Sequence, residues 1–471
     1  MQGFMDQDFL LQTDFAQRLY HGTAEKQPIV DYHSHLSARD IASDRHYSNL
    51  AEAWLDSDAY KARLMRAGGV DERFITGRGT TPRERFQKFV EVLGKAIGSP
   101  VYAWTHMELQ RFFGFYEALT PDTAEEVWEL AGSKLSTPDM GVRGLLKKAG
   151  VKLICTTEDI AANLKPHEQM AGEQAPFRVV PSLRLDEVLR IEDPQWENYM
   201  KYELGQAAGM EEPSTMREVR EMLKKRINYF DSLGCRTADH VLDYLFYAPA
   251  EEYELDDIVG RIINGRGEPT KLQAEQYKTA VLMTLAKEYA KRGWVMQIRF
   301  AAIRNANRGM AELHGSDAGF DCISDVNCAD ALVQLLNALS QRVALPRMIV
   351  YSLNPAAQPV LASILGAFQG AEVPGQLQIG TTCWFNDNRQ GLEAQLRTVG
   401  SLSVLGTAVG MLADAHNPFS LVRHEYYRRI LCNYIGKQVV RGEYPIDIKT
   451  LHELVADICC HNAERYFGFE D

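Results

Sequence analysis

The chain has 471 residues, 45% of them hydrophobic, so it can bury a large core, and its length alone allows about three domains. Its 51 basic and 63 acidic residues give a net charge of −12, which argues against a general binder of nucleic acid backbones. No stretch approaches the roughly 20 apolar residues that cross a bilayer, so we expect no membrane partner.

Two further features predict a cytoplasmic protein. The first turns of the chain carry Asp6, Asp8 and Asp14 and no basic segment followed by an apolar one, so we expect no signal peptide. The eight cysteines include no Cys-x-x-Cys pair and no regular spacing. Buried free thiols in a reducing compartment are therefore the better interpretation.

Residues 28–36 predict the first strand, after a short N-terminal helix. Apolar residues lead into Asp31, and two histidines, His33 and His35, follow with one residue between them. Side chains at i and i+2 project from the same face of a strand, so both imidazoles would stand side by side at its carboxyl end. This pair predicts two metal ligands, although a solvated strand end has the same spacing.

Two long segments interrupt the strands and have mainly helical patterns. We expect residues 37–147 to form a helical excursion near the mouth of a barrel, and residues 186–293 to form a second mainly helical stretch. Between them, residues 151–157 and 177–184 predict strands. The polar cluster at 234–240 interrupts the second stretch, and we interpret it as a loop.

From residue 294 onward the pattern alternates regularly between strand and helix. Strands are expected at 294–300, 346–352 and 376–381, and a last one ends at Asp414. Alternation at this spacing is typical of parallel βα units. We therefore predict an α/β fold, a (β/α)8 TIM-like barrel with inserted helical regions, in which 28–36 and 294–436 form the barrel core and 1–471 form one interleaved unit.

The last predicted strand supplies a partner for the two histidines. The apolar run from Val409 ends in Asp414, and His416 follows. If the first and last strands lie next to each other in a closed barrel, His33, His35 and Asp414 meet at its carboxyl end. Two imidazoles and one carboxylate predict one divalent metal ion, zinc first, with manganese, iron and cobalt also suited.

Several motifs together resemble one known family, the uronate isomerases (glucuronate or galacturonate isomerases) of the amidohydrolase superfamily, whose barrel is of the metal-dependent hydrolase type. They include residues 31–37, Gly234-Cys235-Arg236 with Asp239-His240, Trp384-Phe385-Asn386-Asp387, and the stretches 409–412 and 423–431. The resemblance implies that His33, His35 and Asp414 hold the metal, and that Tyr60 and Asp414 carry protons. It also implies that Arg184 contacts the substrate and that Trp384 lines the pocket.

The chain departs from this family pattern at four positions that face the substrate. Ala59 stands where the family has histidine before Tyr60, and Arg299 stands where it has another histidine. Cys383 replaces the first of two tryptophans. His416 replaces an arginine, and we interpret it as a substituted substrate contact or a neighbour of the centre.

Three arginines favour a sugar acid as the small-molecule substrate, because a guanidinium binds a carboxylate through two parallel hydrogen bonds. They are Arg184, Arg236 and Arg299. Salt bridges at the barrel rim are the competing interpretation for Arg184 and Arg236, and Arg299 either replaces a missing contact or marks a lost one.

The sequence thus predicts a cytoplasmic, metal-dependent isomerase of hexuronates, which converts D-glucuronate to D-fructuronate or D-galacturonate to D-tagaturonate. The same ligand set also permits hydrolysis, because a strand-end aspartate can activate a metal-bound water. A divergent enzyme that epimerises or hydrolyses another sugar acid, and a barrel that binds a sugar acid without turnover, are the alternatives. The sequence leaves open whether the chain forms a homo-oligomer.

Overall fold

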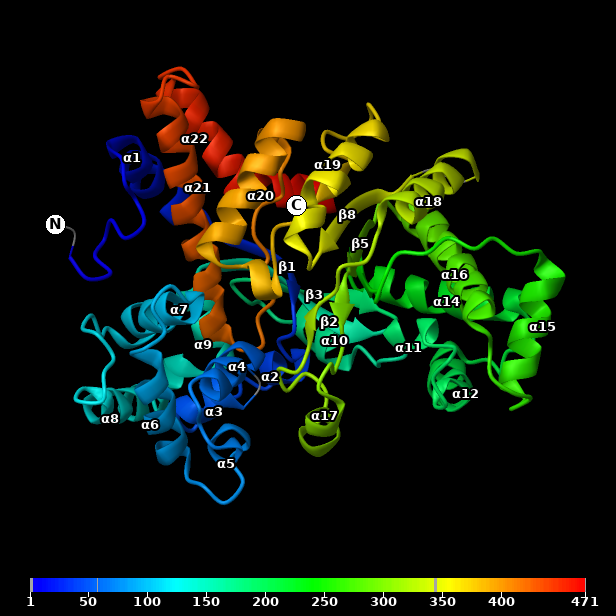
Figure 1. Ribbon diagram of the computed structural model, residues 1–471, viewed down its shortest axis with the longest axis horizontal. Coiled ribbons are helices and arrows are strands. Elements are labelled where there is room, and N and C mark those ends of the chain that lie inside the picture. The colour runs from blue at the N-terminus through cyan, green and yellow to red at the C-terminus, as the bar shows by residue number, and fades with distance from the viewer. Residues whose placement is uncertain (1–2, 57, 343–344, 471) are drawn as a thin grey trace.

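A parallel sheet of seven strands forms the centre of the molecule (Figure 1). The computed structural model describes residues 3–56, 58–342 and 345–470. In spatial order the strands are β1 (Ile29–Ser34), β2 (Val151–Asp159), β3 (Arg178–Arg184), β4 (Thr237–Val241), β5 (Val295–Phe300), β8 (Arg347–Ser352) and β9 (Leu377–Ile379). Every neighbouring pair is parallel, so all carboxyl ends lie at the same edge of the sheet.

The sheet curves until its first and last strands approach one common segment. The carbonyl oxygen of Gly410 accepts a hydrogen bond from the hydroxyl of Tyr32 in β1, at 2.9 Å, and another from the hydroxyl of Thr381, which follows β9. One buried cluster also joins apolar side chains of β1, β2, β3, β5 and β8 with the segment that follows β9, among them Val30, Leu153, Val180, Val295, Ile349 and Leu412. The parallel α/β barrel-like architecture is therefore confirmed.

The eighth position differs from the prediction, because residues 409–415 form no strand. Their backbone is bound by side chains: Asp31 Oδ1 accepts the N–H of Ala413 at 3.2 Å, and Gly410 is held as described above. Gly410 and Asp414 also have positive φ angles, +74° and +49°, which break an extended conformation. A backbone hydrogen bond from the N–H of His35 to the carbonyl of Ala415, at 2.9 Å, fixes this segment beside the end of β1.

A second prediction, the loop at residues 234–240, is corrected by strand β4. The polar cluster at 234–240, interpreted as a loop, contains most of this buried strand. Its polar side chains hid the strand from an analysis of hydrophobicity, and all of them are buried. Thr237 and Asp239 have partners on the neighbouring strand, whereas His240 stacks on Tyr289 of α16. Thr237 accepts from Gln297, and Asp239 accepts from Arg299.

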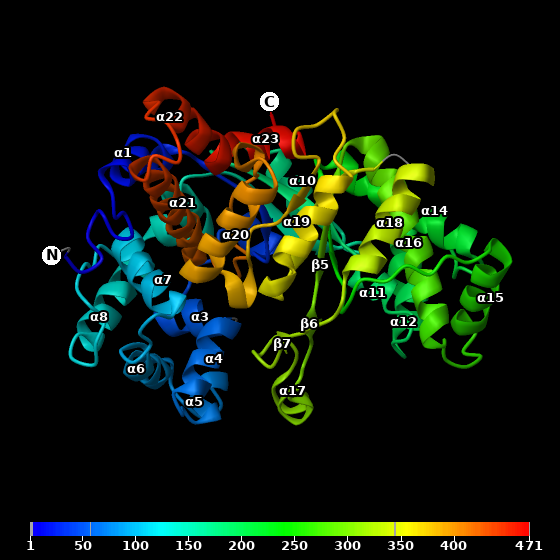
Figure 2. The same cartoon turned by 45° about the horizontal axis from the view of Figure 1, so that its top comes forward.

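The residues between β1 and β2 fold into a helical layer below the carboxyl edge of the sheet (Figures 1 and 2). Its helices are α2 (Ala38–Ala42), α3 (Leu50–Leu55), α4 (Ala59–Ala67), α5 (Glu72–Thr76), α6 (Pro82–Leu93), α7 (Pro100–Glu108), α8 (Ala124–Leu135) and α9 (Val142–Lys148). Side chains cap several of them. The N-cap Asp58 accepts from the N–H of Lys61, which starts α4 at the position that presents Tyr60.

The remaining helices surround the sheet. They are α1 (Asp14–Gly22), α10 (Lys165–Ala171), α11 (Asp186–Leu189), α12 (Trp196–Asn198), α13 (Gln206–Ala208), α14 (Met216–Ser232), α15 (Glu252–Ile263), α16 (Lys271–Arg292), α18 (Ala329–Arg342), α19 (Gln358–Ala367), α20 (Arg389–Leu402), α21 (Val422–Val440), α22 (Ile448–Ala456) and α23 (Asn462–Phe467). Some contact its strands directly, and others, such as α1 and α15, pack on neighbouring helices. Phe467 of α23 stacks on Tyr32 with ring centroids 4.7 Å apart. This packing closes the amino end of the sheet.

A finger-like excursion leaves the sheet after β5 and projects toward the helical layer (Figure 2). It consists of β6 (Ala302–Ile303), α17 (Arg308–His314) and β7 (Cys322–Ile323), with β6 and β7 antiparallel. Arg63 of α4 donates to the carbonyl oxygens of Gly319 and Asp321, at 2.9 and 2.8 Å. The excursion and the helical layer therefore meet directly beyond the carboxyl ends of the strands.

Within the described part of the chain, no helix combines the length and the apolar character that a membrane span requires.

Candidate metal centre and active site

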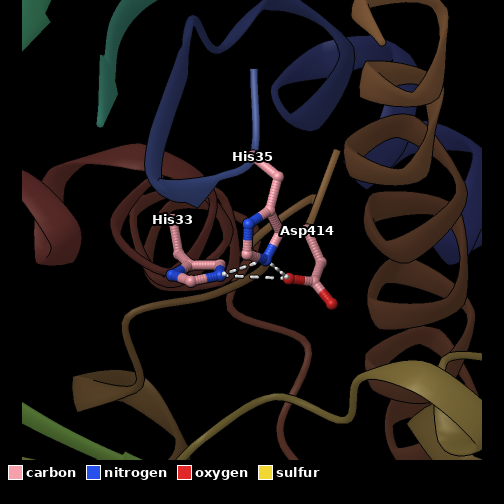
Figure 3. A group of neighbouring side chains, drawn as sticks. All are labelled: His33, His35 and Asp414. Carbon is pink, nitrogen blue, oxygen red and sulfur yellow. Dashed lines mark hydrogen bonds and ion pairs between the residues drawn. The ribbon is translucent and has the colours of Figure 1, made fainter. Parts of the chain in front are cut away.

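His33, His35 and Asp414 converge on one point at the carboxyl edge of the sheet (Figure 3). Nε2 of His33 lies 3.3 Å from Nε2 of His35, and these two atoms lie 3.0 and 3.4 Å from Oδ1 of Asp414. The first histidine is completely buried, whereas the second is partly open to a cavity. The two histidines predicted from the strand period thus meet Asp414, which lies in a segment that forms no strand.

These three donor atoms fit a metal ion. Ligands bonded at about 2.1 Å in tetrahedral geometry lie about 3.4 Å from each other, which is close to the three separations above. Burial lowers the pKa of His35 to about 4, so its imidazole is neutral. Burial opposes ionisation of Asp414, but nearby Arg299 and hydrogen bonds from both histidines hold its pKa well below the usual value. Neutral imidazoles and an ionised carboxylate are the forms that bind a metal.

A buried arginine lies behind the three ligands and holds two carboxylates. Nε of Arg299 donates to Oδ1 of Asp239 at 2.9 Å, and its Nη1 donates to Oδ1 of Asp414 at 3.3 Å. Oδ2 of Asp239 is in turn 4.0 Å from Nδ1 of His33. Arg299 was predicted to contact the substrate, but it does not line the cavity. It orients the centre from behind.

The cavity opens directly on the centre, between the helical layer and the finger-like excursion. Its lining includes the ligands His35 and Asp414, two predicted residues of the substrate pocket, Arg184 and Trp384, and His416. Four arginines reach it from different parts of the chain: Arg63, Arg184, Arg304 and Arg423. Such a concentration of guanidinium groups suits an anionic ligand.

Tyr60 projects into this cavity from the first turn of α4. Its hydroxyl donates to Oδ2 of Asp387 at 3.1 Å, and the guanidinium of Arg423 lies 4.7 Å from its ring centroid. Burial raises the pKa of Tyr60 well above its ordinary value, with a further contribution from Asp387. The side chain therefore stays protonated. Ala59, where the resembled family has histidine, leaves this part of the wall without an imidazole.

The other predicted pocket residues differ in their surroundings. Arg184, at the end of β3, forms a salt bridge with Asp186 at 2.6 Å. Trp384 has a φ of +53°, and the guanidinium of Arg304 lies 4.4 Å from its ring centroid. His416 stacks on His35, with centroids 4.7 Å apart and planes 15° from parallel. Each of these three predicted side chains reaches the cavity.

Arg236, like Arg299, does not line the cavity, although both were predicted to contact the substrate. It precedes β4, at the amino end of the strand, whereas the centre lies at the carboxyl ends. Its Nη1 donates to the carbonyl of Cys235 at 2.7 Å and faces Asp231 at 3.3 Å. The salt-bridge interpretation therefore describes Arg236, and it does not take part in the cavity.

Sequence reasoning assigned no role to Arg423, Arg304 or Asp387. Arg423 and Asp387 both lie in motifs that carried the family resemblance, which was a usable signal. Arg304 lies in the finger-like excursion, where no pattern marked a site. Its place in the cavity depends on how that excursion packs against Trp384.

Comparison with known proteins gives a consistent result along the chain. A model of the glucuronate isomerase family matches residues 1–467. Uronate isomerase of Lachnospira eligens is 43% identical over 471 residues, with all of both chains covered. Uronate isomerase of Caldanaerobacter subterraneus subsp. tengcongensis is 41% identical over 469 residues, covering 99% of this chain and 100% of the relative.

Two solved structures share the fold. The crystal structure of uronate isomerase from Thermotoga maritima superposes with a TM-score of 0.91 at 28% identity, covering 99% of this chain and 100% of that one. Glucuronate isomerase from Caulobacter crescentus gives a TM-score of 0.90 at 22% identity, covering 100% and 98%. Because the family model and the similar sequences span essentially the whole length, the chain belongs to the glucuronate isomerase family.

Proposed function

We propose that this chain interconverts the aldose and ketose forms of a hexuronate, D-glucuronate with D-fructuronate or D-galacturonate with D-tagaturonate. The observation that carries the proposal is the meeting of His33, His35 and Asp414 with Tyr60 around one arginine-lined cavity. The match to relatives called uronate isomerase supports the substrate class.

His33, His35 and Asp414 would hold one divalent ion, with zinc as the first candidate. When bound there, such an ion would supply Lewis-acid stabilisation of negative charge on a substrate oxygen, worth several kcal/mol. Three protein ligands leave a coordination position open, as catalytic metal sites do.

The remaining chemistry is a transfer of protons between neighbouring carbons and oxygens of the sugar. Asp414 stays ionised next to Arg299, so its carboxylate is suited to remove a proton from carbon. Tyr60 stays protonated, so its hydroxyl is suited to give a proton to a sugar oxygen. The two groups thus have opposite protonation states at neutral pH, as an acid–base pair requires.

The substrate carboxylate would bind at the arginines of the cavity. Arg184 comes from the end of β3, and Arg304 from the finger-like excursion over Trp384. Because His416 stands where the family has an arginine, these guanidinium groups are the candidates for a bidentate contact with the substrate. Arg184 also pairs with Asp186, and Arg304 with Asp317 and Asp321.

The test is to purify the protein, measure its bound metal by mass spectrometry, and follow ketose formation from D-glucuronate and D-galacturonate. We expect about one equivalent of metal and turnover that chelation abolishes. Asp414→Asn should lose both metal and turnover, whereas Tyr60→Phe should keep the metal and lose turnover. A metal-loaded protein that leaves both uronates unchanged would contradict the proposal.

A further inference from the structure

A buried carboxyl group holds the hydroxyl proton of Tyr60. Asp387 follows the short helix Trp384–Asn386, and it is 2% exposed. Its Oδ2 accepts from Tyr60 at 3.1 Å, and its Oδ1 is buried without a hydrogen-bond partner among the described residues. Tyr60 lines the cavity, whereas Asp387 does not. In this arrangement the phenolic proton is directed toward Asp387 instead of toward a substrate.

Arg423 faces both groups but leaves Asp387 free to change its protonation state. Its Nη1 donates to the carbonyl of Ala413 at 3.0 Å and lies 3.6 Å from Oδ2 of Asp387, beyond hydrogen-bonding distance. Burial raises the pKa of Asp387 to about 7 even though the guanidinium opposes it. Near neutral pH, therefore, Asp387 exists both as a carboxylate and as a carboxylic acid.

Tyr60 cannot easily give up its proton alone. Burial raises its pKa well above 10, so a free tyrosinate in this site is costly. A group that returns a proton to the phenolic oxygen in the same step removes that cost. The geometry offers one such group within hydrogen-bonding distance, the carboxyl of Asp387.

We propose that Asp387 is a positioning residue that turns the hydroxyl of Tyr60 toward the substrate and replaces the proton that Tyr60 gives away. With Asp387 protonated, its O–H donates to the phenolic oxygen and the Tyr60 O–H turns into the cavity. The Tyr60 O–H bond breaks as a bond to the sugar oxygen forms, and the Asp387 proton moves to the phenolic oxygen. Tyr60 ends neutral, and the new Asp387 carboxylate is stabilised by Arg423. This inference rests on the proposed isomerisation.

Several titratable or charged groups face Asp387 and set the conditions for a test. They come from α4, from the residue before the short helix, from segment 409–415 and from α21: Tyr60, Cys383, Asp414, Arg423 and Tyr426. Burial raises the pKa of Cys383 to about 12 and that of Tyr426 to about 12. Among these groups, Asp387 is the one whose pKa lies near 7.

The experiment measures kcat and KM of the metal-loaded enzyme for a hexuronate between pH 5.5 and 8.5, with Asp387→Asn beside the unchanged protein. In the unchanged protein, kcat should decline as pH rises through about 7, because the proton-supplying acid form is lost. Asparagine preserves the shape and an N–H donor but cannot release a proton. We expect its kcat to fall about 100-fold with no decline near pH 7, and KM to change by less than about threefold.

Glu158→Gln is the matched control. Burial also raises the pKa of Glu158 to about 7, but this side chain does not line the cavity, so the variant should keep the unchanged profile. Asp387→Glu retains an ionisable carboxyl and should show the decline of kcat with rising pH again. If Asp387→Asn does not fold, the pH profile of Asp387→Glu is the measurement that tests the inference. The inference would be overturned if the Asp387→Asn enzyme kept the decline of kcat near pH 7, or if the substitution changed KM and left kcat as it was. Inactivity of the unchanged protein on both uronates would instead overturn the proposed function.

Discussion

Arg299 binds Asp414, with Nη1 3.3 Å from Oδ1, and it does not line the cavity that Asp414 faces. The same guanidinium holds Asp239, and all three side chains are buried. A bound cation would therefore share one ligand with a fixed protein cation. Both positive charges compensate the same buried carboxylate.

Replacing Arg299 by Gln should destabilise the metal-free protein by about 3–5 kcal/mol, because two buried carboxylates lose their charge partner. Zinc should then raise the melting temperature of this variant more than that of the unchanged protein, since the ion takes over part of the compensation. Thermal unfolding with chelator and with zinc measures both effects.

Arg226→Gln is the control for this prediction. Arg226 is also buried, but it donates to the carbonyl oxygens of Ile160, Ala162 and Ala207 and, among the described residues, to no carboxylate. The Arg226→Gln substitution should lower the melting temperature by the same amount with zinc as without it. If zinc raised the melting temperature of Arg299→Gln and of the unchanged protein by the same amount, the metal would not compensate the charge of the buried carboxylates.

Arg184→Gln should lower kcat/KM for the hexuronate about 10- to 100-fold, because a charged hydrogen bond to the substrate is lost. Arg236→Gln, the same substitution at the arginine outside the cavity, should leave kcat/KM unchanged. Steady-state kinetics at one pH compares the two variants. If Arg236→Gln shows the larger loss, the assignment of the cavity is wrong.

Glu158 predicts a pH dependence of stability. Burial raises its pKa from 4.5 in the unfolded chain to about 7, so the folded protein holds this proton more tightly. The free energy of unfolding should therefore fall as pH rises from about 4.5 to about 7, by at most about 3 kcal/mol, and stay level above. Glu158→Gln should remove this contribution. Denaturant unfolding at pH 5 and pH 8 tests it, and an equal pH dependence in both proteins would refute it.

Gly410 is required where the closing segment meets the rest of the molecule. Its φ is +74°, and a Cβ there would lie 2.2 Å from the carbonyl oxygen of Ile458. Gly410→Ala should cost more than about 2 kcal/mol, because it adds a clash to the conformational strain. Gly442→Ala, with a φ of +72° and open space around the added Cβ, should cost only about 1 kcal/mol. Equal costs would show that the contact with Ile458 is unimportant.

The sequence by itself determined the parts of the site that depend on local geometry. His33 and His35 share a face because side chains alternate along a strand. Asp414 was predicted beside them from an expected eighth parallel strand, and it lies there although residues 409–415 form no strand. The regular alternation after residue 294 was enough to predict a parallel sheet. The family motifs added Tyr60, Arg184 and Trp384, and all three line the cavity.

Tertiary structure decided what depends on packing between distant segments. The sequence pattern predicts a strand at residues 409–415. In the structure, side chains of Asp31, Tyr32 and Thr381 bind this backbone in place of the hydrogen bonds of a neighbouring strand. Tyr60 and Asp387 are 327 residues apart, and no local pattern indicates that they meet. Arg299 does not line the cavity, because it is buried next to two carboxylates that bind its guanidinium. Periodicity fixes which face a side chain occupies, but its partner on that face is chosen only when the whole chain packs.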